Sequence, residues 1–62
     1  MRVAIIKKGI SITGIMNEGM FEIILNFVEE SKCKVEFKDY STKALITGND
    51  KQLNNFIKLW DN

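Results

Sequence analysis

The stretch CKVEFKDYSTKALIT, at positions 33–47, decides the expected fold, because it reads as two strands joined by a tight turn. Apolar and charged side chains alternate over residues 33–39, which is typical of a strand with one buried face. Tyr40 and Ser41 are the expected turn. Residues 42–47 are expected to return as the second strand of a hairpin.

The turn also determines which side chains face each other across the two strands. Phe37 is expected opposite Ala44, and Val35 opposite Ile46, so that the apolar side chains share one face. A shift by one residue would turn Ala44 and Ile46 to the other face, so the pattern selects this register. The other face is expected to be exposed and to carry Lys34, Glu36, Lys38 and Leu45.

A helix is expected after this hairpin. Asn49 is a good N-cap residue, and Gln52, three residues later, can complete a capping box. Apolar residues then follow at the i, i+3, i+4 and i+7 spacing of one narrow helical stripe. They are Leu53, Phe56, Ile57 and Trp60.

The helix expected before the hairpin has a broader apolar surface. Asn17 is a good N-cap residue, and Ser31-Lys32 is expected to end the helix. At 100° per residue the apolar arc is about 200° wide, whereas a helix that packs on one surface needs roughly 100°. The margins of this arc are the expected protein-binding residues: Phe21 and Leu25 on one side, and Ile23 and Phe27 on the other.

The first residues are expected to form one or two further strands. Residues 3–6 are a continuous apolar run, typical of a central strand or of one covered on both faces. Residues 10–13 alternate between Ile and Ser or Thr, as in a half-buried strand. Lys8-Gly9 is interpreted as a hairpin turn between the two segments. The alternative is a bulge or bend at Gly9 in one long strand.

These elements predict a single α+β domain over residues 1–62. It is a two-layer sandwich, with two helices on one face of a mainly antiparallel sheet of three or four strands, in the order (β)βαββα. The arrangement resembles a variant of the ferredoxin-like fold. Without the optional first strand, the order βαββα is similar to that of the DinI-like modulators of recombinase filaments. It also resembles a ligand-binding ACT module that lacks its last strand. The expected core is Val35, Phe37, Ile46, Ile24, Val28, Leu53, Phe56, Ile57 and Trp60.

Composition excludes several kinds of site. The nine Lys and Arg against eight Asp and Glu leave a net charge of +1, too small to draw the chain to nucleic acid or membranes as a whole. There is no His, and the one Cys allows neither an internal disulfide nor a four-ligand zinc site. We therefore expect no catalytic residue, no metal, no cofactor and no membrane segment, and a cytoplasmic location.

Three features could carry chemistry, and each has a plainer interpretation. Cys33 lies between two lysines, yet the alternation places it among core side chains. Acidic residues of the first helix are expected to face solvent; they are Glu18, Glu22, Glu29 and Glu30. The loop from Gly14 to Gly19 precedes a helix N-terminus, where backbone N–H groups can bind an anion. The resemblance to ACT modules implies a small-ligand site near the same loop.

A second surface is expected on the charged face of the sheet. Sheet faces that bind RNA combine basic side chains with exposed aromatic rings. Tyr40 supplies such a ring at the hairpin turn. The basic residues expected to accompany it are Lys7, Lys8, Lys34, Lys38 and Lys43.

The leading expectation is a small non-enzymatic binding protein that acts as a regulator or inhibitor through a protein–protein surface. Its nine Ile, eight Lys and six Asn use AT-rich codons, as in small chains encoded by phages or other mobile elements. The second helix can shield one margin of the apolar arc but hardly both, so a homodimer or another protein partner is expected. Nucleic-acid binding is the alternative, and an ACT-like small-ligand sensor is the third hypothesis.

Overall fold

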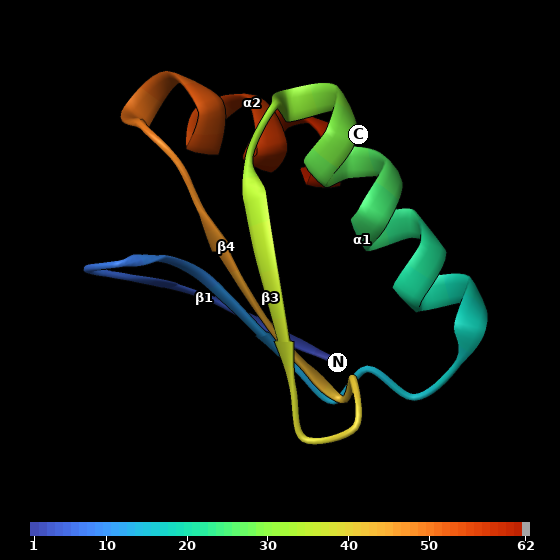
Figure 1. Ribbon diagram of the computed structural model, residues 1–62. Helices are drawn as coiled ribbons and strands as arrows, with labels where there is room; N and C mark the ends of the chain where they lie inside the picture. The colour runs from blue at the N-terminus through green and yellow to red at the C-terminus, as the bar shows by residue number, and fades with distance from the viewer. Residues whose placement is uncertain (62) are drawn as a thin grey trace.

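The structure, a computed structural model, describes residues 1–61 and arranges them as four strands and two helices. The elements are β1 (Arg2–Ile6), β2 (Gly9–Thr13), α1 (Glu18–Ser31), β3 (Lys34–Lys38), β4 (Lys43–Thr47) and α2 (Asp50–Asp61). Both helices lie on the same side of the sheet (Figure 1). The predicted two-layer α+β sandwich is therefore confirmed in its four-stranded form.

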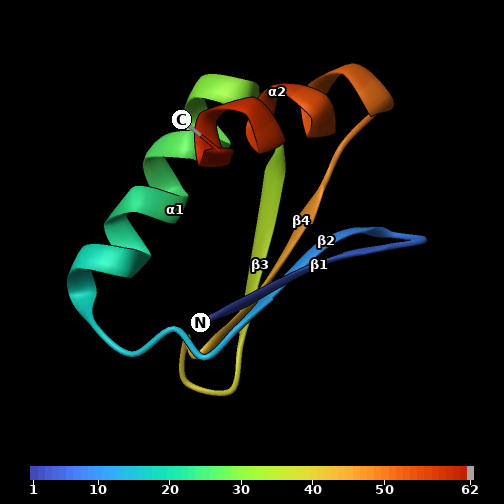
Figure 2. The ribbon, with the colours of Figure 1, turned by 180° about the vertical axis from the view of Figure 1, so that it is seen from behind.

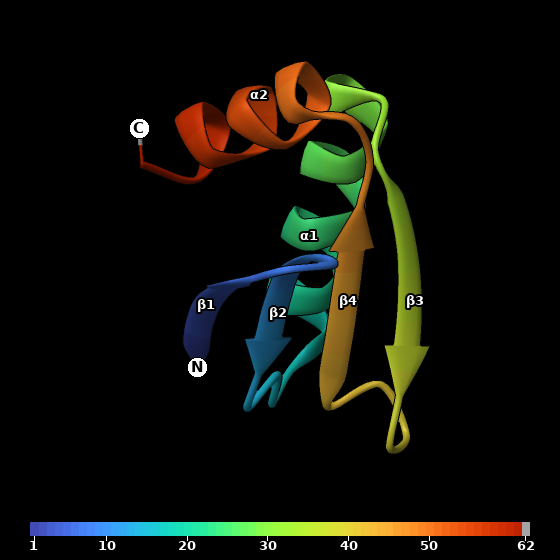
Figure 3. The ribbon, with the colours of Figure 1, turned by 90° about the vertical axis from the view of Figure 1, so that its left-hand side faces the viewer.

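The strands form one antiparallel sheet in the order β1-β2-β4-β3 (Figure 3). β2 and β4 occupy the centre, where Ile12 pairs with Ala44 and Ile10 with Ile46. In the ferredoxin-like order βαββαβ the last strand follows the second helix. Here β1 comes before β2 in the chain and pairs with it at the sheet edge. The chain is thus a ferredoxin-like variant in which the strand beside β2 at the sheet edge is the first strand of the chain instead of the last.

The register predicted for the β3–β4 hairpin is confirmed. Val35 pairs with Ile46, and Phe37 pairs with Ala44. Glu36 pairs with Leu45 on the opposite face, as expected. The connection is longer than the predicted two-residue turn, because β3 ends at Lys38 and β4 begins at Lys43. The register is unchanged because the longer turn keeps the same centre and a shift would expose the apolar face.

The turn of this hairpin has an unusual backbone. Asp39, Tyr40 and Ser41 have φ angles of 52°, 56° and 64°, in the left-handed region that favours glycine and asparagine. The Thr42 N–H donates to the Asp39 carbonyl oxygen over 3.1 Å, and the Thr42 hydroxyl donates to the same oxygen over 2.7 Å. Asp tolerates this conformation, whereas Tyr40 and Ser41 are residue types that rarely adopt it, so the two bonds help to hold the turn.

The favoured β1–β2 hairpin is confirmed, but its turn lies one residue earlier than predicted. Ile6 pairs with Gly9, so Lys7 and Lys8 form the turn. The prediction that residues 3–6 form a central strand, or one covered on both faces, is wrong. β1 is an edge strand, and all five of its residues are exposed. Figure 1 and, from behind, Figure 2 show that the turn end of this hairpin points away from α1.

Local signals set the helix ends as predicted. The Met20 N–H donates to Asn17 Oδ1 over 2.9 Å at the start of α1, and Lys32 ends this helix in a left-handed conformation. At the start of α2 the Gln52 N–H donates to Asn49 Oδ1 over 2.8 Å. The Asn49 N–H donates to Gln52 Oε1 over 2.9 Å, which completes the capping box.

The core lies between the two middle strands and the helices. Its buried hydrophobic residues are Ile10, Ile12, Ile15, Ile24, Val28, Ala44, Ile46 and Phe56. Five of the predicted core residues are instead half-buried around this centre: Val35, Phe37, Leu53, Ile57 and Trp60. For Val35 and Phe37 the correction follows from strand order, because β3 lies at an edge of the sheet and the side chains of β2 take the central place under the helices. On α2, Ile57 and Trp60 line an open groove beside β1, which leaves them partly exposed.

Candidate functional site

Four large apolar side chains in and next to β1 are exposed to solvent. The exposed fractions are 51% for Met1, 39% for Val3, 75% for Ile5 and 42% for Ile6. We call these four residues the β1 edge. A strand that is apolar on both faces is typical of a covered position, whereas an exposed apolar edge strand is a template for pairing with another chain. The β1 edge is therefore the first candidate binding surface.

A groove lies beside the β1 edge, between β1 and α2. Val3 and Ile5 pair with Ile12 and Ile10, so they point toward the helix layer. The groove has a volume of about 320 Å³ and is lined by Val3, Ile5, Ile10, Phe56, Ile57, Trp60 and Asp61. The C-terminal end of α2 lies on the β1 side of the sheet (Figure 3). Groove and strand edge thus form one continuous, mainly apolar surface.

Two of the four predicted protein-binding residues on α1 are engaged within the fold. The ring of Phe21 packs on Phe37 with centroids 4.5 Å apart. The ring of Phe27 contacts Phe56 and Trp60 edge-on, with centroids 6.2 and 6.1 Å apart. β3 therefore covers part of one margin of the apolar arc, and α2 covers part of the other.

The remaining two predicted residues of α1 are exposed. Ile23 is 49% exposed and Leu25 is 37% exposed. They lie at opposite margins of the arc, so the buried face of α1 separates them. The structure does not join Ile23 and Leu25 into one patch, and single exposed apolar residues are common on protein surfaces.

Basic residues lie in a row across the open face of the sheet. The register places Arg2, Thr13, Lys43 and Lys38 side by side on the four strands. Tyr40, at the adjoining β3–β4 turn, is fully exposed. Lys34 pairs with Thr47 at the far end of the same face, nearer the turn that holds Lys7 and Lys8. The predicted basic residues therefore gather at two ends of the sheet.

The charges of residues 1–61 divide between the two layers. The strands and hairpin turns hold six cations (Arg2, Lys7, Lys8, Lys34, Lys38, Lys43) and two anions (Glu36, Asp39). The helices and the end of α1 hold three cations (Lys32, Lys51, Lys58) and six anions (Glu18, Glu22, Glu29, Glu30, Asp50, Asp61). The net charges are +4 and −3, which give the +1 of the whole chain.

Two ion pairs reduce the positive charge of the sheet face. Lys43 Nζ lies 3.2 Å from Asp39 Oδ2, and Lys38 Nζ lies 3.9 Å from Glu36 Oε1. All four side chains are more than half exposed. Exposed pairs of this kind are weak and are screened by salt, so both lysines can still contact an anion.

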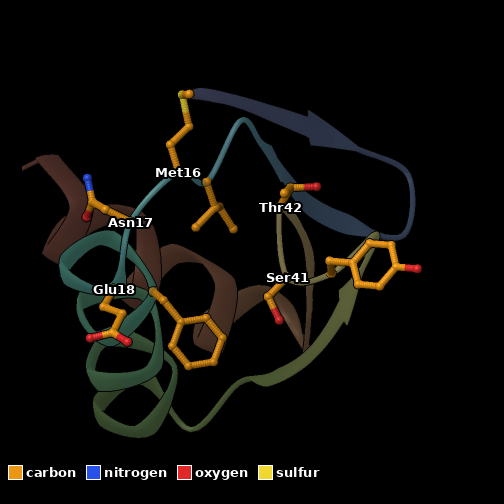
Figure 4. A pocket seen from close by; sticks show the side chains of 8 residues that line it. Met16, Asn17, Glu18, Ser41 and Thr42 are labelled. Atoms are coloured by element: carbon orange, nitrogen blue, oxygen red, sulfur yellow. The ribbon is translucent and has the colours of Figure 1, made fainter.

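The predicted small-ligand loop borders an open hollow of about 620 Å³. Asn17 and Glu18 lie on one side of it, and Ser41 and Thr42 lie on the other (Figure 4). Two of these polar groups are already engaged, because Asn17 Oδ1 accepts the Met20 N–H and the Thr42 hydroxyl donates to a backbone carbonyl. The hollow therefore has few polar groups left to recognise a ligand.

The remaining chemical candidates stay separate from these surfaces. Cys33 is a free, half-buried thiol packed against the core. Among residues 1–61, no group of three or more His, Cys, Asp or Glu side chains is arranged to hold a metal ion. In the same residues, neither helix has the length and apolar character needed to cross a bilayer.

Comparison with protein-family models, with curated proteins and with solved structures finds no match for this chain. The exposure of Val3 and Ile5 was not predicted, because their apolar run also fits a covered strand. The β1–β2 hairpin was the sequence signal that could have indicated an exposed edge. If β2 pairs with β1 on one side and with a later strand on the other, β1 lies at an edge of the sheet.

Proposed function

We propose that this chain is a small non-enzymatic binding protein that acts as a regulator or inhibitor through a protein–protein surface. The observation that carries the proposal is the β1 edge, an apolar strand with its helix-facing side chains in solvent. Full burial of one large apolar side chain, such as Ile5 or Val3, contributes about 1.5–3 kcal/mol of free energy. This is a large share of the stability of so small a domain. A protein that covers them recovers this free energy.

Addition of a strand is the binding mode that suits this surface. An extended segment can form main-chain hydrogen bonds with the free side of β1, while its alternate side chains enter the groove beside α2. The exposed Ile23 and Leu25 of α1 are a second, smaller apolar surface for the same function.

Capture of partners from a lysate of the native host distinguishes these two surfaces. An Ile5→Lys chain should retain at least about tenfold less of any protein that the tagged wild-type chain captures, because it places a charge in the apolar edge. Ile23→Lys is the matched control, since it makes the same change at an exposed site on α1. Equal capture by wild type and Ile5→Lys, with loss in Ile23→Lys, would move the site to α1.

Nucleic-acid binding is the second candidate, and the +4 charge of the sheet layer supports it. Arg2, Lys43 and Lys38 lie in one row on an open face, beside the exposed ring of Tyr40. Such a face can contact phosphates while the ring stacks on a base. Glu36 on the same face opposes this binding.

Fluorescence anisotropy with single-stranded oligonucleotides tests this candidate. If Arg2, Lys38 and Lys43 each contact a phosphate, log K should fall with log[salt] with a slope of about −2. Lys43→Glu should weaken binding, whereas Lys51→Glu, on α2, should weaken it less because it lies in the other layer. A binding curve that salt does not change would exclude this candidate.

A further inference from the structure

We infer that a second copy of this chain covers the β1 edge, with the two β1 strands paired antiparallel across a two-fold axis. The inference rests on the proposed function, because it names the protein that binds there. β2 pairs with one side of β1, and no other strand of residues 1–61 pairs with the opposite side. A two-fold axis lets the same apolar surface shield itself, since each copy contributes the β1 edge.

The direction of the side chains selects the register of this pairing. Val3 and Ile5 point toward the helix layer, while Ala4 points to the open face of the sheet. Odd-numbered residues must therefore lie opposite odd-numbered residues, so that the helix layers of both copies lie on one side. The register centred on Ala4 meets this condition and pairs all of Arg2–Ile6, with Val3 of one copy opposite Ile5 of the other.

Charge favours the same register. Arg2 then lies opposite Ile6 of the second copy, so no two cations of the paired strands face each other. A register shifted by two residues toward the turn would place Arg2 opposite Lys8, and like charges in direct opposition destabilise a strand pair. Arg2 shares the open face of the sheet with Ala4, so its charge stays outside the groove, whose lining holds one charged residue, Asp61.

The groove beside α2 explains why an apolar strand fits there. A second β1 laid along the first brings its own Val3 and Ile5 next to the same two side chains of the first copy. They then lie near Ile57 and Trp60, the half-buried residues of α2 that line the groove. The two copies would thus share one apolar cluster across the axis, beneath the ends of both α2 helices.

The size of this contact sets the expected affinity. A stable interface buries about 800 Å² on each partner, and interfaces below about 1,200 Å² in total are those of weak complexes. A five-residue strand and one groove of about 320 Å³ offer a contact at the small end of this range. We therefore expect a dimer with a dissociation constant in the micromolar range.

Disulfide trapping tests the register. In a Cys33→Ser background, Ala4→Cys should form a disulfide-linked dimer under mild oxidation, because residues in direct opposition have Cα atoms about 4.5–5.5 Å apart. Arg2→Cys is the matched control on the same strand and face. In this register the position 2 side chains of the two copies lie four residues apart along the strands, beyond the reach of a disulfide. The Arg2→Cys chain should therefore not form a cross-linked dimer under the same conditions.

Sedimentation equilibrium tests the dimer without a cross-link. From about 1 to about 300 µM the wild-type mass should rise from 7.1 kDa toward twice that value. Ile5→Lys should weaken the dimer at least about tenfold. Asn26→Lys, which adds the same charge at an exposed position of α1, should not change it, and Ile23→Lys tests the other apolar surface. Circular dichroism of each variant checks that the fold is retained.

Three results would overturn the inference: a monomer throughout this range, a dimer that responds to Ile23→Lys but not to Ile5→Lys, or efficient trapping by Arg2→Cys instead of Ala4→Cys. The proposed function is judged separately by lysate capture. A monomeric chain whose capture of a partner is lost in Ile5→Lys would exclude the second copy while leaving a different protein at the β1 edge.

Discussion

Replacing Phe56 with alanine should remove most of the stability of this chain. Phe56 is 1% exposed, its ring stacks on Trp60 with centroids 5.9 Å apart, and it contacts Phe27 from α1. A Phe→Ala change at a buried site costs about 3–5 kcal/mol. A domain of this size has roughly 3–9 kcal/mol in total. We expect the urea unfolding midpoint to fall to near zero or the chain to be unfolded without denaturant.

Lys51→Ala provides the control for Phe56→Ala on the same helix, because Lys51 is exposed and should change the stability by no more than about 0.5 kcal/mol. Phe37→Ala should cost less than Phe56→Ala, since the Phe37 ring lies half-buried on an edge strand. If Phe56→Ala unfolds at the same urea concentration as the wild type, the packing between the helices and the sheet is not the one described.

Gly9→Ala should have the second large effect, although it adds one methyl group. A Cβ at Gly9 would clash with the carbonyl oxygen of Ile46, and the φ angle of 151° is one that residues with a side chain rarely adopt. The obstacle is the backbone of β4, so relief requires β2 and β4 to move apart at the centre of the sheet. We expect a loss of at least about 2–3 kcal/mol by thermal or urea unfolding.

Gly19→Ala is the matched control for Gly9→Ala. Gly19 has no left-handed φ angle, and its added Cβ would lie 3.2 Å from the side-chain oxygen of Asn17 and meet no backbone atom of another element. Because alanine favours the helix, the net change should stay below about 1 kcal/mol. Equal stability of the Gly9→Ala and wild-type proteins would contradict the close approach of β2 to β4.

The parts of the fold that were predictable from the sequence depend on neighbours in the chain. The β3–β4 register follows from alternation across a short turn, and the capping box of Asn49 and Gln52 spans four residues. The excess apolar arc of α1 was also visible as a pattern. Each of these signals lies within one element or one hairpin, where spacing translates directly into geometry.

The order of the strands was not predictable, and most of the errors follow from it. The central pairing joins Ile10 to Ile46, which are far apart in the chain and have no local pattern in common. Without it, the apolar run of β1 looks like a covered strand. Ile15 was missed for a different reason. It is a single apolar residue in a loop, buried where its N–H donates to the Thr42 carbonyl oxygen over 2.9 Å.

The sequence indicated a candidate surface on α1 but not the exposed β1 edge. Apolar excess on α1 pointed to a protein partner, yet Phe21 and Phe27 find their contacts inside the fold. How far a helix margin is covered depends on where the neighbouring helix and edge strand lie, which is a tertiary property. The exposed lysines of β3 were placed correctly because alternation alone determines their face.

The division of charge between the layers makes this small protein an electric dipole. Charges of +4 and −3, separated by about 10 Å, the spacing of packed layers, correspond to a moment on the order of 10² debye. At a pH of about 7.8, where the charges of the sequence balance, little net charge repels other copies, so attraction between opposite layers acts unopposed at low ionic strength. Moderate salt screens that attraction, so the solubility of the chain should increase when salt is added at low ionic strength.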